Sequence, residues 1–307
     1  RVLFRSNKVL TFLRRSMMKL QHITKKYGQN TVLDDIDFDF GESQIVGLIG
    51  KNGVGKTTLM KVMNNNIINY QGKVDMPKSE NVGYLIEHPK LYGNKTGLFN
   101  LKLFAQVLGD GFDKEYANHI IEAFGMKPYI KKKVNKYSMG MKQKLSIAVS
   151  LMNKPKYLIL DEPTNGMDPD GSIDVLKTIQ SLVQQLEMKI LISSHKLEDI
   201  ELICDRAVFL RDGKFVQDVD MKDGGPEDST ILTLQKDDFN KALDSLSENF
   251  KVQQSQKESG EIIIKAQNDY RELLKSLSQL DIYPKYIETR KSSLRDTYFN
   301  INQRGDK

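Results

Sequence analysis

Short runs of apolar residues recur between residues 44 and 210, and stretches with helical spacing separate them. The runs are residues 44–49, 157–160, 189–192 and 207–210. Such runs are typical of strands covered on both faces, and their alternation with helices predicts a parallel α/β sheet. In sheets of this kind a ligand binds at the carboxyl ends of the strands.

The segments around this predicted sheet follow other patterns. Residues 19–27 and 32–40 alternate apolar and polar side chains, which predicts antiparallel strands with one solvated face. We also expect strands at residues 73–75 and 81–86 and a helix at residues 58–63.

The middle of the chain has the period of helices. Between residues 98 and 151 apolar side chains recur at helical spacing, as at Leu101, Phe104, Ala105 and Leu108. We therefore expect a helical subdomain at about residues 88–153, inserted into a domain that spans residues 18–222.

A breaker sequence, residues 223–226, precedes a more polar C-terminal part, which we expect to be a separate α+β domain at residues 227–307. The expected strands are residues 230–235, 251–254, 261–266 and 282–287, and the expected helices are residues 237–247 and 268–278. The resulting order β-α-β-β-α-β is that of a small ferredoxin-like sandwich.

Residues 1–17 precede the first predicted strand, do not begin with Met and lack the layout of a signal peptide. We expect them to be a non-native or disordered leader, with the natural start at Met17 or Met18.

The composition is that of an ordinary globular protein that is long enough for two domains: 307 residues, 39% hydrophobic and 28% charged. A single cysteine, Cys204, excludes an internal disulfide. No apolar run approaches the roughly 18 residues that span a bilayer, so any work at a membrane needs a partner.

The net charge of +6 is a mild excess of basic residues, and the densest basic cluster is residues 131–133 with Lys136. We interpret that cluster as a solvated loop, with attraction to an anionic surface as the alternative.

The most specific motif follows the first apolar run. Residues 50–57, Gly-Lys-Asn-Gly-Val-Gly-Lys-Thr, fit the phosphate-binding pattern GxxxxGK[ST]. Gly53 and Gly55 let backbone N–H groups turn toward phosphates, Lys56 adds a positive charge, and Thr57 offers a hydroxyl to Mg²⁺. The predicted nucleotide-binding residues in this loop are Gly50, Asn52, Gly53, Gly55, Lys56, Thr57 and Thr58. The alternative is a glycine-rich turn that fits by accident.

A second motif ends the run at residues 157–160. Asp161 and Glu162 follow this apolar strand. Asp161 can hold Mg²⁺, usually through water, and Glu162 can polarise the water that attacks a γ-phosphate. A solvated acidic turn is the alternative.

Between these motifs lies Tyr-Ser-Met-Gly-Met-Lys-Gln at residues 137–143, followed by a helix-like segment. Here the chain resembles the ATP-binding subunits of ABC transporters. The LSGGQ-type segment of that family appears in this chain as Tyr-Ser-Met-Gly-Met. The resemblance implies that Ser138 and Gly140 contact the γ-phosphate of ATP that is bound to the other ATPase subunit of a dimer.

Other family elements follow in order, and the resemblance extends over roughly residues 19–220. By resemblance, Tyr27 stacks on adenine, Asp168 acts across the dimer, and His195 contacts the γ-phosphate or orients Glu162. As isolated residues, Tyr27 and His195 would more often have packing or structural roles.

One position departs from most of the family. Glu87 stands where glutamine is usual, and we expect it to be a Mg²⁺ ligand together with Thr57 and Asp161. This variant resembles the glutamate-containing loop of the ATPases of lantibiotic-immunity and bacitracin-type exporters. The sequences of residues 91–97 and 137–143 also resemble that subgroup. Residues 292–299 resemble the closing segment of many drug- and peptide-export ATPases, and an ordinary capped helix is the alternative.

The resemblance implies a Mg-ATP-hydrolysing subunit that is cytoplasmic and peripheral on the inner face of the cell membrane. The expected partners are a second copy of the chain and a separate membrane permease, with an antimicrobial peptide or similar amphiphile as cargo and no nucleic acid. One alternative is a soluble ABC-type ATPase acting on ribosomes or nucleic acid. Another alternative is a P-loop kinase or GTPase, but such a protein would have no counterparts of residues 138–143 and His195.

Overall fold

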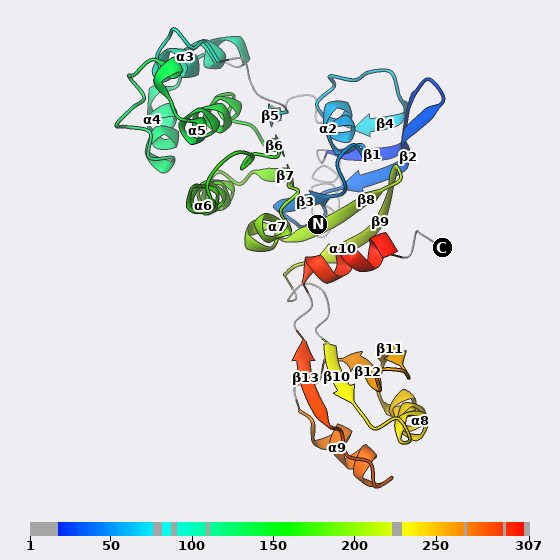
Figure 1. Cartoon of the computed structure of the whole chain (residues 1–307). Coiled ribbons are helices and arrows are strands. Elements are labelled where there is room, and N and C mark those ends of the chain that lie inside the picture. Colours follow the sequence, from blue (N-terminus) through cyan, green and yellow to red (C-terminus); the bar gives the residue numbers. More distant parts are fainter. Residues whose placement is uncertain are drawn as a thin grey trace, which may run out of the picture. The chain divides into compact units, whose positions relative to one another are not determined.

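The computed structural model describes residues 18–75, 82–86, 91–108, 111–222, 229–266, 269–290 and 293–303 (Figure 1). The chain divides into two compact units, Arg1–Met221 and Lys222–Lys307. The predicted leader at residues 1–17 lies outside the described residues. None of the helices in the described ranges has the length and apolar character that crossing a membrane requires.

A six-stranded sheet forms the centre of the first unit. Its strands are β5 (Val82–Leu85), β6 (Tyr157–Asp161), β7 (Lys189–Ser193), β3 (Ile45–Ile49), β8 (Arg206–Arg211) and β9 (Lys214–Asp220), in that spatial order. All neighbouring pairs are parallel except β8 and β9. Every residue of β3 is buried, which confirms the prediction of strands covered on both faces.

The edge strand β9 is absent from the sequence prediction. Only Val219 is buried along it, and five of its seven residues are exposed. A strand with this polar pattern has neither a continuous apolar run nor clear alternation, so periodicity does not detect it.

A smaller antiparallel sheet, in the order β2-β1-β4, carries the predicted alternating strands. It consists of β1 (Lys19–Tyr27), β2 (Asn30–Asp39) and β4 (Gln71–Asp75). Its buried side chains, such as Leu20 and Phe38, share one core with Val46 and Leu48 of β3. This shared core holds the two sheets together, and it also contains Leu59 and Met60 of the helix that follows β3.

The middle of the first unit is helical. It contains α3 (Gly97–Leu108), α4 (Lys114–Ala123), a 3₁₀ turn (Val134–Lys136) and α5 (Met139–Ser150), and α3 packs against α5. Figure 1 shows α3, α4 and α5 grouped away from the small sheet. The remaining helices of the unit are α2 (Lys56–Met63), α6 (Pro169–Gln185) and α7 (Leu197–Ile203).

The second unit is built on a four-stranded antiparallel sheet with the order β11-β12-β10-β13. Its elements are β10 (Ser229–Thr233), α8 (Phe239–Asn249), β11 (Val252–Gln256), β12 (Glu261–Lys265), α9 (Arg271–Ser278), β13 (Tyr286–Arg290) and α10 (Leu294–Gln303). Leu232 and Ile262 of the sheet form a core with Leu246 of α8 and Leu277 of α9. The predicted element order is therefore present up to β13.

The last predicted strand, residues 282–287, is displaced. Ile282 is buried in the core of the unit, and its backbone N–H donates to the Leu277 carbonyl at 3.0 Å, so it belongs to the turn that ends α9. Pro284 has no N–H to give to a strand ladder. The strand therefore begins at Tyr286, which pairs with Thr233.

The predicted C-terminal segment forms a capped helix. The Ser293 backbone N–H donates to the Asp296 carboxylate at 3.1 Å, and the Asp296 N–H donates to the Ser293 hydroxyl at 3.3 Å. This reciprocal pair starts α10. The local sequence thus has a structural explanation as a helix cap.

Candidate active site

The glycine-rich loop connects the carboxyl end of β3 to α2. A Cβ atom at Gly50 would lie 2.6 Å from the Leu210 carbonyl oxygen. Gly55 has a φ of 114°, and a Cβ there would lie 2.9 Å from the Val32 carbonyl oxygen. Backbone packing therefore requires glycine at both positions, and the loop can turn its N–H groups toward the start of α2.

Lys56 is buried at the base of this loop, with 6% of its surface exposed. Its Nζ donates to the carbonyl oxygens of Gly50 at 2.8 Å and Lys51 at 3.1 Å. Burial lowers the pKa of Lys56, whereas the charges of Glu162 and Asp161 act in the opposite direction. The ammonium group thus lies near two carboxylates and is held by the loop itself.

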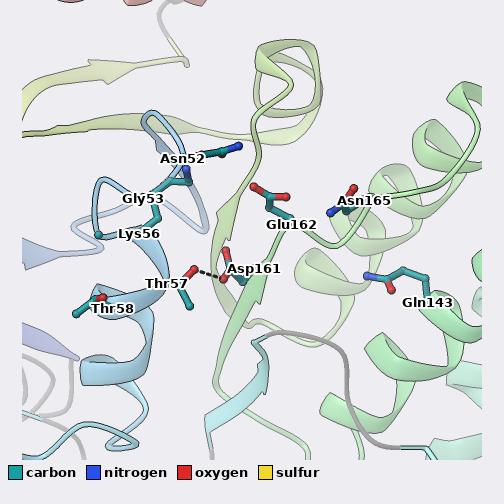
Figure 2. A pocket seen from close by; sticks show the side chains of 10 residues that line it. Asn52, Gly53, Lys56, Thr57, Thr58, Gln143, Asp161, Glu162 and Asn165 are labelled. Carbon is teal, nitrogen blue, oxygen red and sulfur yellow. Dashed lines mark hydrogen bonds between the residues drawn. The ribbon is translucent and has the colours of Figure 1, made fainter. Parts of the chain in front are cut away.

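Thr57 and Asp161 bring the two sequence motifs into direct contact. The Thr57 hydroxyl donates to Asp161 Oδ2 at 2.6 Å, drawn as the dashed line in Figure 2. The Ser193 hydroxyl donates to the other oxygen, Oδ1, at 2.5 Å. A hydroxyl and a carboxylate side by side are hard oxygen donors, so this pair fits Mg²⁺.

Ser193 also holds the second acid of the motif. The backbone N–H of Glu162 donates to the Ser193 carbonyl oxygen at 3.2 Å and to its Oγ at 3.0 Å. Glu162 has a φ of 47°, a conformation that few residues other than glycine adopt. One serine at the end of β7 therefore orients both acids at the end of β6.

His195 faces the Glu162 side chain. The imidazole Nδ1 lies 3.3 Å from Glu162 Oε2, and both side chains remain partly accessible to solvent. This distance places a titratable ring beside the carboxylate that the sequence assigns to water activation.

A buried network supports the loops that carry these two side chains. The hydroxyl of Thr164 donates to Asp199 Oδ2 at 2.6 Å, and the hydroxyl of Ser194 donates to the same oxygen at 3.0 Å. Asp199 lies on α7, so it joins the loop after Glu162 to the residue before His195.

The two motifs line one cavity of about 410 Å³. Its lining residues are Asn52, Gly53, Gly55, Lys56, Thr57, Thr58, Gln143, Asp161, Glu162 and Asn165. In Figure 2 the phosphate loop lies on one side of this cavity, and Gln143 and Asn165 lie on the other. The structure therefore brings most of the predicted nucleotide-binding residues together.

Four further residues of the site are not among those predicted from the sequence: Gln143, Asn165, Ser193 and Asp199. Gln143 stands within the motif at residues 137–143, and Asn165 lies three residues before Asp168, so both positions carry a signal that could have found them. Ser193 and Asp199 become relevant only when the ends of β6 and β7 are brought side by side.

Tyr27 lies at the end of β1, and the cavity lining does not include it. Tyr27 is 51% exposed, and Lys25 Nζ lies 4.6 Å from the centroid of its ring. The large exposed fraction leaves aromatic surface available for stacking on a base.

The residues predicted to act across a dimer lie outside this cavity lining. The Ser138 hydroxyl accepts from the Met141 N–H at 3.2 Å and caps α5, and Asp168 accepts from the Gly171 N–H at 2.8 Å and caps α6. Both residues are exposed, and Gly140 is half-buried. Glu87 lies outside the described residues.

Comparison with known proteins gives consistent matches. The protein-family model described as ABC transporter matches residues 33–165. The uncharacterized ABC transporter ATP-binding protein YdbJ of Bacillus subtilis is 33% identical over 296 residues, which cover 92% of this chain and 94% of that protein. The bacitracin transport ATP-binding protein BcrA of Bacillus licheniformis is 32% identical, covering 77% of this chain and 80% of BcrA. The lantibiotic transport ATP-binding protein SrtF of Streptococcus pyogenes is 35% identical, covering 65% of this chain and 89% of SrtF.

Solved structures agree with the fold. A structure described as the ATP binding subunit of an ABC transporter matches with a TM-score of 0.58 and 25% identity, covering 68% of this chain and 91% of that one. A dimeric structure of MJ0796, a bacterial ABC transporter cassette, matches with a TM-score of 0.60 and 20% identity, covering 67% of this chain and 99% of that one.

Proposed function

The chain belongs to the ATP-binding subunits of ABC transporters, which hydrolyse ATP, and from this membership we propose that it powers export of an antimicrobial peptide or a similar amphiphile. Export would run through a separate membrane-spanning permease, with this chain bound at the inner face of the cell membrane. The names of BcrA and SrtF support this class of cargo. The observation that carries the proposal is that Lys56, Thr57, Asp161 and Glu162 line one cavity together.

We assign the triphosphate to the loop of Gly50, Asn52, Gly53 and Gly55, with Thr58 following in α2. Backbone N–H groups and the positive end of the α2 dipole would hold the phosphates. Lys56 would exchange its loop carbonyls for phosphate oxygens, since its ammonium group already lies beside the cavity. Tyr27 would stack on adenine, and its 51% exposure supports that role.

Thr57 and Asp161 would hold Mg²⁺, with Glu87 as a further proposed ligand. The 2.6 Å contact between the Thr57 hydroxyl and Asp161 Oδ2 supports this pair. When bound, the ion supplies positive charge that neutralises charge on the β- and γ-phosphate oxygens.

Glu162 would accept a hydrogen bond from the attacking water and polarise it for in-line attack on the γ-phosphate. His195 would orient the Glu162 carboxylate, and the 3.3 Å separation of Nδ1 and Oε2 supports this. Ser193 would keep Glu162 and Asp161 in register, because its hydroxyl bonds to both residues.

We further propose a head-to-tail homodimer in which Ser138, Gly140 and Asp168 of one copy complete the ATP site of the other. Their position outside the cavity lining of their own chain supports an action on a second copy. Ser138 is exposed at the start of the twelve-residue helix α5, and a helix N-terminus favours an anion.

We propose that the ATPase domain spans residues 18–222 and that residues 227–307 form an accessory ferredoxin-like domain. The order β-α-β-β-α-β and the antiparallel sheet β11-β12-β10-β13 support that topology.

Export is tested in cells that carry the chain together with a membrane permease that co-purifies with it. We expect the pair to raise the inhibitory concentration of a bacitracin-type or lantibiotic peptide. Lys56→Ala in the same pair should abolish the effect, because the loop then lacks its ammonium group. Equal protection by Lys56→Ala, or no protection against any amphiphilic peptide by a pair that hydrolyses ATP, would contradict the proposed cargo class.

A further inference from the structure

The helical part of the first unit carries a basic surface that the proposed hydrolysis does not use. Five exposed lysines lie on it beside two exposed aromatic rings. Its members are Lys95, Lys131, Lys132, Lys133, Lys136, Tyr92 and Phe99, and we name this set the lysine surface.

Backbone bonds hold the two segments of the lysine surface together. The Val134 N–H donates to the Lys95 carbonyl oxygen at 2.9 Å, and Thr96 forms an isolated antiparallel bridge with Lys133. Lys95 Nζ lies 5.2 Å from the centroid of the Phe99 ring. Residues distant in the sequence therefore present their charges and rings on one part of the fold.

Among the described residues, no carboxylate neutralises the charge of this surface. Other lysines of the same region pair with carboxylates: Lys127 with Glu122 at 2.6 Å, and Lys154 with Asp113 at 2.7 Å. Within the part of the chain that the structure describes, no carboxylate pairs with any of the five lysines of the surface. Five like charges repel one another and favour an anionic partner.

We propose that the lysine surface binds the anionic headgroups of a lipid bilayer. Lysine ammonium groups are compact charges on flexible stems, which suit a diffuse layer of phosphates better than one fixed anion. Tyr92 is 53% exposed and Phe99 40% exposed, and aromatic rings beside lysines favour the boundary between headgroups and acyl chains. Membership in a transporter family supports lipid over nucleic acid. This inference goes beyond the proposed function and does not depend on it, because lipid binding needs neither ATP nor a permease.

The charge contribution has a predictable size. Each lysine near an anionic membrane contributes about fivefold to binding, and added salt screens this contribution. Removal of three lysines should therefore weaken binding on the order of 100-fold at low salt.

The test is co-sedimentation of the full chain with vesicles of phosphatidylcholine, alone or mixed with phosphatidylglycerol. We expect binding to the mixed vesicles only, and a decline as salt is added. The triple variant Lys131→Gln, Lys132→Gln, Lys133→Gln should lose this binding while keeping its circular dichroism spectrum and basal ATPase rate. The matched control changes three exposed lysines elsewhere, Lys114→Gln, Lys177→Gln and Lys241→Gln, and should bind almost as the wild type does.

Several outcomes would overturn the inference. They are absence of wild-type binding to the mixed vesicles, equal binding to neutral vesicles, and equal loss in the triple variant and its control. Binding to single-stranded RNA without binding to vesicles would point to nucleic acid instead. Loss of permease assembly by the triple variant, with vesicle binding unchanged, would point to a protein partner. The wild-type comparison of the two vesicle types decides the matter even if the triple variant fails to fold.

Discussion

The hydroxyl of Ser193 is the smallest group that links the two acids of the candidate site. It donates to Asp161 and accepts from the Glu162 backbone N–H, while Glu162 keeps a φ of 47°. A hydrogen bond to a charged group contributes about 1.5–3 kcal/mol, so this one side chain has a large effect on geometry. The Ser193 hydroxyl is not among the groups that we assign to nucleotide binding.

We therefore expect Ser193→Ala to lower kcat for ATP hydrolysis by about tenfold to 100-fold, with a much smaller change in ATP affinity. The loss arises because Asp161 and Glu162 are no longer held in register. Steady-state ATPase assays with nucleotide-binding titrations measure the two quantities separately. Ser181→Ala, at an exposed position of α6, is the control. An unchanged kcat, or a loss confined to affinity, would rule out the orienting role.

Some residues of the candidate site can be recognised from the sequence alone, and others cannot. Residues 50–57 are contiguous, so their chemistry is visible as a motif. The role of Ser193 depends on the pairing of β6 with β7, which places Asp161 opposite Ser193 across two adjacent strands. Such a contact follows from strand order, which local pattern does not encode.

Among the elements, α7 positions the loops of the site rather than forming its lining. Asp199 of α7 is buried and accepts from the hydroxyls of Thr164 and Ser194. These bonds join α7 to the loop after β6 and to the end of β7. The arrangement fixes the backbone on both sides of the contact between Glu162 and His195.

Asp199→Ala should lower the free energy of unfolding by about 3 kcal/mol, because two buried hydroxyl groups lose their charged acceptor. Chemical denaturation followed by circular dichroism measures the loss. Asp199→Asn keeps an acceptor oxygen and should cost clearly less. Glu198→Ala, on the exposed neighbouring residue, should change stability by less than about 0.5 kcal/mol. Equal stability of the alanine variants at 198 and 199 would refute the supporting role of α7.

Element prediction succeeded where apolar periodicity was strong. The apolar runs that form β3, β6, β7 and β8 lie in the interior of the sheet. Because these strands are buried, their sequences are continuous apolar runs that are easy to recognise. The edge strand β9 has five exposed residues and left no such signal. The strand predicted at residues 282–287 was displaced because the apolar Ile282 is packed in the core beside the end of α9.

For the whole molecule, the chain combines an ATP-binding unit with a second compact unit. The match to YdbJ covers 92% of the chain, whereas the match to BcrA covers 77%. The long match extends well past residues 33–165, which the family model matches. The α/β core and the order of the C-terminal elements were predicted from sequence, since both depend on local pattern and motif order.

The central claim is that two copies of the chain enclose ATP and hydrolyse it. The most direct test measures the mass of Glu162→Gln by light scattering, with and without saturating Mg-ATP. We expect this variant to bind ATP, to lose turnover and to double its mass when ATP is present, while the double variant Lys56→Ala, Glu162→Gln stays monomeric. A Glu162→Gln variant that remains monomeric at saturating Mg-ATP, or that hydrolyses ATP at the wild-type rate, would contradict the account.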